Sequence, residues 1–119
     1  MKGYRVPKLL PTTVVGSYPK FKVVKEAFKK FKRGSIDEEA LDRAVKEATA
    51  SVIRDYLEAG LDILSDGEQR REDMAVYFAE RLEGFKIDGW VRIFGNVYFR
   101  KPLVVGEERF KSPMTLDDW

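Results

Sequence analysis

The fold of this chain is decided by the stretch Leu61-Asp62-Ile63-Leu64-Ser65-Asp66-Gly67-Glu68-Gln69-Arg70-Arg71-Glu72-Asp73-Met74. Its first residues form a short apolar run, and the residues after Gly67 are almost all charged or amide side chains. A short apolar run between two glycines is typical of a buried strand. In a parallel sheet, the residues just past the carboxyl end of a strand carry the chemistry. We therefore expect a strand over residues 61–64, with Glu68 as the candidate functional residue beyond it.

An earlier stretch, Thr12-Thr13-Val14-Val15-Gly16-Ser17-Tyr18-Pro19, has the same organisation. Its β-branched residues predict a strand over residues 12–15. Gly16 and Ser17 then form a flexible turn that carries a hydroxyl group. If the two strands are parallel neighbours, Ser17 and Glu68 emerge at the same edge of the sheet.

Two helices are predicted between these strands. From Val23 onward, apolar residues at helical spacing lie opposite a row of lysines until Gly34 ends the pattern. Ser35-Ile36-Asp37-Glu38 has the capping-box pattern and opens a second helix, which Gly60 ends in a left-handed conformation. Helices in this position suit a right-handed crossover between parallel strands.

The last third of the chain predicts a third helix and a hairpin. The helix extends from Met74 to Leu82, and Gly84 ends it. Residues 90–94 and 97–100 flank Gly95-Asn96, a two-residue turn signal, and so predict an antiparallel hairpin. The remaining segments are an irregular lead-in over residues 1–11, a short strand over 103–105 and a tail over 107–119 without a clear period.

The composition narrows the possible functions. With 44% hydrophobic and 35% charged residues, the chain is globular rather than disordered. It contains no cysteine and no histidine, so thiolate nucleophiles, imidazole bases and the usual zinc ligands are absent. No run of about 20 apolar residues and no signal-peptide pattern occurs, so we expect a cytoplasmic protein without a membrane partner. At 119 residues the chain falls short of the ~250 residues of a complete eight-stranded α/β barrel.

Five motifs, in order along the chain, together carry a family resemblance. They are Pro11-Thr12-Thr13-Val14-Val15-Gly16-Ser17-Tyr18-Pro19, Gly60-Leu61-Asp62-Ile63-Leu64 with Asp66-Gly67-Glu68, Asp73-Met74 with Tyr77-Phe78, Gly89-Trp90-Val91, and Pro102-Leu103-Val104-Val105-Gly106. From Leu10 to about Trp119, the chain resembles the start of the catalytic domain of cobalamin-independent methionine synthase, especially its short archaeal form. The resemblance implies an α/β fold, a partial (β/α)8 TIM-like barrel made of the first strands and helices plus an antiparallel β-hairpin insertion. Residues 1–119 would then form a single incomplete domain.

The resemblance also implies a role in methionine biosynthesis, by methyl transfer to the zinc-bound thiolate of homocysteine. In the family, the segment matching Val15-Gly16-Ser17 and the glutamate matching Glu68 hold the amino-acid part of homocysteine. A carboxylate pairs with the substrate ammonium, while a hydroxyl and backbone amides receive its carboxylate. The family's zinc ligands, a histidine, two cysteines and a glutamate, lie in the later part of the barrel. We therefore expect no catalytic residue and no metal ligand in this chain, and no activity of the chain alone.

The methyl donor implied by the resemblance is either a corrinoid or a folate. Folate-using relatives carry an arginine followed by a cysteine in the hairpin, where this sequence has Val97-Tyr98. A corrinoid donor, as in the short archaeal relatives, is easier to reconcile with Val97.

Two other classes of function stay open. A partial barrel leaves sheet edges uncovered, which would suit a non-catalytic interaction protein that pairs with the remaining barrel polypeptide or with a second copy. Lysines interleaved with Phe21, Phe28 and Phe31 would suit a basic nucleic-acid-binding module. Those phenylalanines fall on the apolar side of one helix, however, and the net charge is only +2, so a nucleic-acid partner is less expected.

Each candidate residue also has a purely structural interpretation. Glu68 would suit the first turn of a helix, where acidic side chains are favoured, and Ser17 would suit an ordinary turn. The aromatic residues of the hairpin are expected to pack across the strands; they are Trp90, Phe94, Tyr98 and Phe99.

Overall fold

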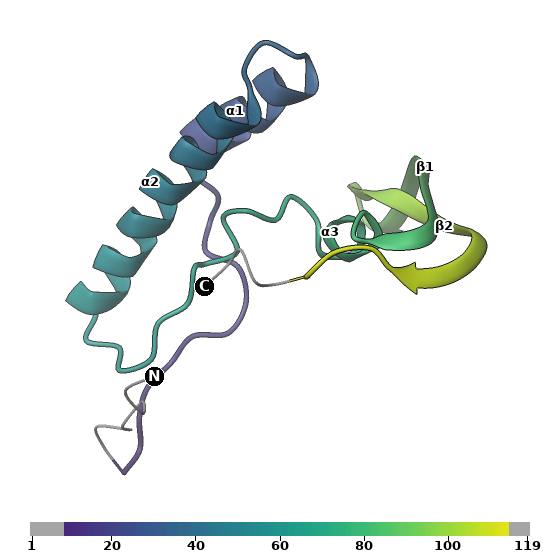
Figure 1. Ribbon diagram of the computed structural model, residues 1–119. Coiled ribbons are helices and arrows are strands. Elements are labelled where there is room, and N and C mark those ends of the chain that lie inside the picture. Colours follow the sequence, from purple (N-terminus) through teal and green to yellow (C-terminus); the bar gives the residue numbers. More distant parts are fainter. Residues whose placement is uncertain (1–8, 115–119) are drawn as a thin grey trace. The chain divides into compact units, whose positions relative to one another are not determined.

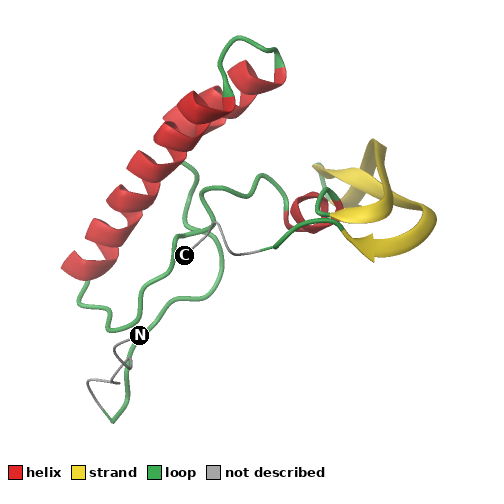
Figure 2. Cartoon of the chain, in the orientation of Figure 1, coloured by secondary structure: helices red, strands yellow, loops and turns green. Residues whose placement is uncertain are grey.

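A computed structural model describes residues 9–114, which contain three helices and a two-stranded sheet (Figure 1). The elements are α1 (Lys22–Lys32), α2 (Glu38–Glu58), α3 (Met74–Ala79), β1 (Leu82–Phe94) and β2 (Val97–Phe110). The chain divides into two units, Met1–Gln69 with α1 and α2, and Arg70–Trp119 with α3 and the hairpin (Figure 2). Most of the predicted lead-in and the end of the predicted tail, residues 1–8 and 115–119, lie outside the described residues. No helix within residues 9–114 is long and apolar enough to cross a membrane.

The first unit is built on the apolar faces of α1 and α2. Val24, Val45 and Ala48 form its buried cluster, and Phe21 and Phe28 pack against it together with Leu41. The lysines of α1 are exposed, as the amphipathic pattern predicts. Because Phe21 and Phe28 are used in the core, they are not free to stack on bases.

The start of α2 differs from the predicted capping box. Asp37 is the N-cap, and its carboxylate accepts a hydrogen bond from the Ala40 amide at 2.8 Å. Ser35 instead belongs to the end of α1, where its amide donates to the Lys30 carbonyl at 2.9 Å. The prediction that Gly60 ends α2 is confirmed, since Gly60 has a φ of 75° and follows the last residues of the helix.

The segments predicted as strands, residues 12–15 and 61–64, lie side by side but form no regular strand, so these two strand predictions were wrong. The amides of Asp62 and Ile63 both donate to the Thr12 carbonyl, at 3.2 and 3.0 Å. The Asp62 carboxylate accepts a hydrogen bond from the Thr12 amide at 3.0 Å. In a regular parallel sheet, a backbone carbonyl of the neighbouring strand would accept this bond. Further along, the Tyr18 amide donates to the Gly67 carbonyl at 3.0 Å. The paired positions advance together, so the two segments run in the same direction, as predicted.

The second unit contains the predicted antiparallel hairpin around Gly95-Asn96, which is confirmed. Its strands are longer than expected: β2 includes the predicted strand over 103–105 and the first part of the tail. The third helix is shorter, because α3 ends at Ala79 and Leu82 already belongs to β1.

Gly84 explains why the helix prediction failed. This residue lies in β1 at a register irregularity, with a φ of 82°. A Cβ atom at this position would lie 2.5 Å from the Glu107 carbonyl oxygen. The glycine therefore permits a close approach of two strands rather than ending a helix.

The aromatic residues of the hairpin do not pack against one another across the strands. Trp90 pairs with Arg100, Val91 with Phe99, and Arg92 with Tyr98. Trp90 and Phe94 are each 67% exposed. The register therefore places each aromatic residue opposite a non-aromatic one, so Phe99 and Phe94 face Val91 and Val97 rather than another ring.

Candidate functional site

The predicted site residues lie on two adjacent loops of the first unit. We call residues 15–18 the serine corner and residues 65–68 the glutamate corner. The hydrogen bond from the Tyr18 amide to the Gly67 carbonyl joins the residue after Ser17 to the residue before Glu68. The two corners are therefore held together through their backbones.

The four predicted residues differ in exposure. The Val15 side chain is 99% exposed, and Gly16 and Ser17 are also exposed, whereas Glu68 is half-buried. Gly16 has a φ of 95°, so the serine corner turns through a conformation that favours glycine. This arrangement leaves Val15, Gly16 and Ser17 at the surface, on a corner whose backbone is bonded to the corner that carries the half-buried Glu68. A role for these residues in substrate binding stays a prediction.

Glu68 has an unusual backbone conformation. Among the described residues it is the only one other than glycine with a positive φ, 56°. A left-handed conformation costs a residue with a Cβ atom roughly 1–2 kcal/mol. The glutamate corner holds it with its own side chains: the Asp66 carboxylate accepts from the Glu68 amide at 3.0 Å, and the Ser65 hydroxyl accepts from the Gly67 amide at 3.2 Å. Such strain is concentrated at functional sites, where neighbouring structure holds it in place.

Gly67 lets the two corners meet against α2. It is buried with a φ of 64°, and a Cβ atom there would lie 2.7 Å from the Tyr18 Cβ and 2.8 Å from the Val52 Cγ1. No side chain fits in this space. The glycine therefore fixes how closely the glutamate corner, the serine corner and α2 approach one another.

Gln69 is the residue that sequence reasoning missed. Its side chain is fully buried, and its Nε2 lies 3.3 Å from the Tyr18 carbonyl oxygen and 3.4 Å from the Gly67 carbonyl oxygen, donating to both. The Lys20 ammonium donates to the Gln69 carbonyl at 3.2 Å. In the sequence, Gln69 is one of a row of polar residues, and only its burial distinguishes it from them.

Tyr18 connects the serine corner to α2 through its side chain. Its hydroxyl donates a hydrogen bond to the Asp55 carboxylate, and its ring stacks on Phe21 at 5.8 Å and meets Tyr56 edge-on at 5.7 Å. The hydrogen bond to Asp55 raises the pKa of the Tyr18 hydroxyl above its ordinary value, because ionisation would break the bond and place two negative charges together.

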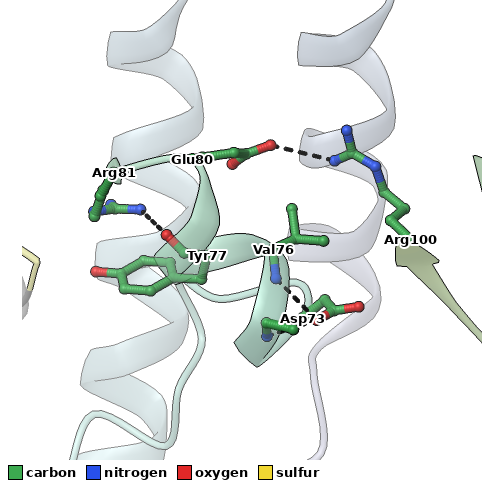
Figure 3. Close-up of polar contacts among 7 residues, drawn as sticks. Asp73, Val76, Tyr77, Glu80, Arg81 and Arg100 are labelled. Atoms are coloured by element: carbon green, nitrogen blue, oxygen red, sulfur yellow. Dashed lines mark hydrogen bonds and ion pairs between the residues drawn. The ribbon is translucent and has the colours of Figure 1, made fainter. Parts of the chain in front are cut away.

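A polar cluster in the second unit serves α3 and the hairpin rather than a binding site (Figure 3). The Asp73 carboxylate caps α3 by accepting from the amides of Ala75 and Val76, at 2.8 and 3.2 Å. The Arg81 guanidinium donates to the Tyr77 carbonyl at 2.9 Å and lies 3.6 Å from the centre of the Tyr77 ring. Each of these groups thus satisfies a local structural need.

The residues present do not fit a zinc site. The chain contains no histidine and no cysteine. Across residues 9–114, no three Asp or Glu side chains gather where they could hold a metal ion. The described residues therefore offer no ligand set for zinc.

Comparison with known proteins identifies the family. Residues 10–119 match the family described as the cobalamin-independent synthase, catalytic domain. The chain belongs to this family. The resemblance predicted from the sequence is thereby confirmed.

Individual relatives agree with this assignment to the cobalamin-independent synthase family. The chain is 46% identical over 110 residues to methionine synthase of Sulfolobus acidocaldarius, covering 92% of this chain and 32% of that protein. It is 44% identical over 111 residues to methionine synthase of Saccharolobus solfataricus, covering 93% and 33%. The chain thus spans about a third of the length of the curated relatives it matches.

A solved structure confirms the α/β fold class. It is a B12-independent methionine synthase from Shewanella sp. W3-18-1 in complex with selenomethionine, with a TM-score of 0.71 and 27% sequence identity. The similarity covers 93% of this chain and 33% of that chain.

Proposed function

We propose that residues 1–119 are the opening portion of a methionine-synthase-like (β/α)8 barrel, a single incomplete domain that contributes the homocysteine-binding part of its pocket. The family assignment supports this proposal, as does the share of the relatives that the chain spans. In the complete enzyme the reaction is methyl transfer to homocysteine, which forms methionine.

A negatively charged group and a set of hydrogen-bond donors would hold the amino-acid part of homocysteine. The Glu68 carboxylate pairs with the substrate ammonium, and the Ser17 hydroxyl with the backbone of Val15 and Gly16 receives the substrate carboxylate. The observation that carries this proposal is the hydrogen bond between Tyr18 and Gly67, which holds the two corners side by side on segments that run in the same direction. An acidic group and a hydroxyl-bearing corner held next to each other can bind the ammonium and the carboxylate of one amino acid.

The remaining parts of the reaction belong to other residues of the barrel. The zinc ligands and the activation of the thiol must come from outside this chain, so the isolated chain is expected to be inactive. The methyl donor is a corrinoid or a folate. Val97 and Tyr98, which stand where folate-using relatives carry an arginine and a cysteine, are 37% and 54% exposed.

A hybrid enzyme tests the proposal. In it, residues 10–119 of this chain replace the matching segment of the Sulfolobus acidocaldarius methionine synthase. Glu68→Gln in the hybrid should raise the KM for homocysteine about tenfold or more, because a charge-assisted hydrogen bond is replaced by a neutral one. Glu47→Gln, at an exposed position of α2, is the matched control and should leave the KM unchanged. An unchanged KM in Glu68→Gln would remove Glu68 from the pocket.

A further inference from the structure

We infer that Gln69 is a positioning residue for the homocysteine pocket, whose buried carboxamide sets the spacing between the serine corner and the glutamate corner. The inference rests on the proposed function, since it concerns the same pocket. It adds a residue that itself does not touch the substrate.

The contacts of the carboxamide carry the inference. Its Nε2 reaches the Tyr18 carbonyl at 3.3 Å and the Gly67 carbonyl at 3.4 Å, one from each corner. The Tyr18 amide donates to the same Gly67 carbonyl at 3.0 Å. The three bonds form a closed set that joins the residue after Ser17 to the residue before Glu68. A displacement of either corner must stretch at least one of them.

The orientation of the carboxamide follows from its surroundings. If the group were rotated by half a turn, its oxygen would face two carbonyl oxygens, and neither of them can donate a hydrogen bond. With Nε2 directed at the carbonyls, no donor among the described residues lies within hydrogen-bonding distance of Oε1. Nε2 therefore holds one carbonyl from each corner, and the main effect of this side chain is geometric.

The position of Gln69 explains how Glu68 keeps its strained backbone. Glu68 lies between Gly67, whose carbonyl accepts two hydrogen bonds, and Gln69, whose side chain is fully buried and whose carbonyl accepts from Lys20 at 3.2 Å. Both neighbours are thus fixed, and Glu68 must complete the turn between them with a φ of 56°. The backbone of this turn therefore sets the direction in which the Glu68 side chain leaves the chain.

The first test measures the geometry in the chain of 119 residues itself. Gln69→Met keeps the length and volume of the side chain but removes both donors. Hydrogen exchange of the Tyr18 amide, followed by NMR, should become about tenfold faster, while the exchange of amides in the middle of α2 stays unchanged. Exchange of Tyr18 at the original rate would overturn the inference. Glu47→Gln serves as the control and should alter neither rate.

The second test separates positioning from a purely structural role, using the hybrid enzyme. Gln69→Met should raise the KM for homocysteine about fivefold to tenfold, leave kcat within twofold and change the midpoint of thermal unfolding little. If Glu68→Gln raises the KM and Gln69→Met does not, the positioning role is wrong and the proposed pocket stands. If Glu68→Gln has no effect either, the proposed function fails, and hydrogen exchange in the isolated chain still decides whether Gln69 joins the two corners.

Discussion

Glu68 combines a charged side chain with a backbone conformation that glutamate rarely adopts. The sequence predicts the residue as functional, because an acidic group follows an apolar run, but it gives no sign of the positive φ. That conformation arises from the fixed residues on either side, Gly67 and Gln69. The Asp66 carboxylate adds a local bond to the Glu68 amide, but the contacts that fix Gly67 and Gln69 join residues about fifty positions apart, and local sequence patterns do not contain such contacts.

Replacing Glu68 with glycine should separate stability from function. Glycine adopts a positive φ without steric cost, so Glu68→Gly should raise the free energy of unfolding of the first unit by about 1 kcal/mol, reduced somewhat by the greater freedom of the unfolded chain. Chemical denaturation followed by circular dichroism measures this change. A loss of stability of the same size would mean that the Glu68 side chain supports the fold and that its backbone is not strained.

The Tyr18 hydroxyl should titrate at unusually high pH. Its hydrogen bond to the Asp55 carboxylate raises its pKa in the folded state above the ordinary value of about 10. A raised pKa favours the protonated form, so this contribution to stability is complete below pH ~10 and is lost as the pH rises through the folded-state pKa.

Ultraviolet absorbance of tyrosinate, compared with and without Tyr18→Phe, identifies this titration. Asp55→Asn should return the pKa of Tyr18 towards its ordinary value. Glu58→Gln, which removes an exposed carboxylate near the end of the same helix, should not. An equal effect of both variants would show that general charge, rather than the hydrogen bond, governs the pKa.

At the scale of elements, helices α1 and α2 follow from the sequence because their apolar periodicity and their glycine ends are local features. The segments over residues 12–15 and 61–64 were correctly paired and directed but wrongly assigned as strands. A regular strand needs backbone hydrogen bonds spread evenly along its partner. Here the Thr12 carbonyl accepts two amides, and the Asp62 carboxylate accepts a third. The pattern around Gly84 was misread because a glycine that ends a helix and one at a strand irregularity look alike in sequence.

A pair of substitutions in β1 distinguishes strain from steric overlap. Gly84 and Gly89 both have positive φ values, 82° and 70°, but only at Gly84 would a Cβ atom meet the opposite strand, at 2.5 Å from the Glu107 carbonyl oxygen. Gly89→Ala should therefore cost about 1 kcal/mol through the backbone alone. Gly84→Ala should cost clearly more and reduce the cross-strand nuclear Overhauser effects of the hairpin. Equal costs would contradict the close approach at Gly84.

At the scale of the whole molecule, the family follows from motifs spread over almost the entire chain, whereas the proposed methyl transfer would also need zinc ligands, and the sequence contains no histidine or cysteine. The chain spans about a third of its curated relatives. Its proposed contribution is recognition of an amino acid, and under the same proposal the chemistry of methyl transfer would fall to the rest of the barrel. The isolated chain, given zinc, homocysteine and a methyl donor, should produce no methionine detectable by mass spectrometry, and turnover would contradict this division of roles.

The proposed pairing of Glu68 with the substrate ammonium can be tested by changing both partners in the hybrid enzyme. The KM is determined for homocysteine and for the analogue that lacks its amino group, each with Glu68 and with Glu68→Gln. We expect the substitution to raise the KM for homocysteine about tenfold or more and to leave the KM for the analogue nearly unchanged, because the analogue has no ammonium for the carboxylate to pair with. An equal rise for both compounds would show that Glu68 does not bind the amino group.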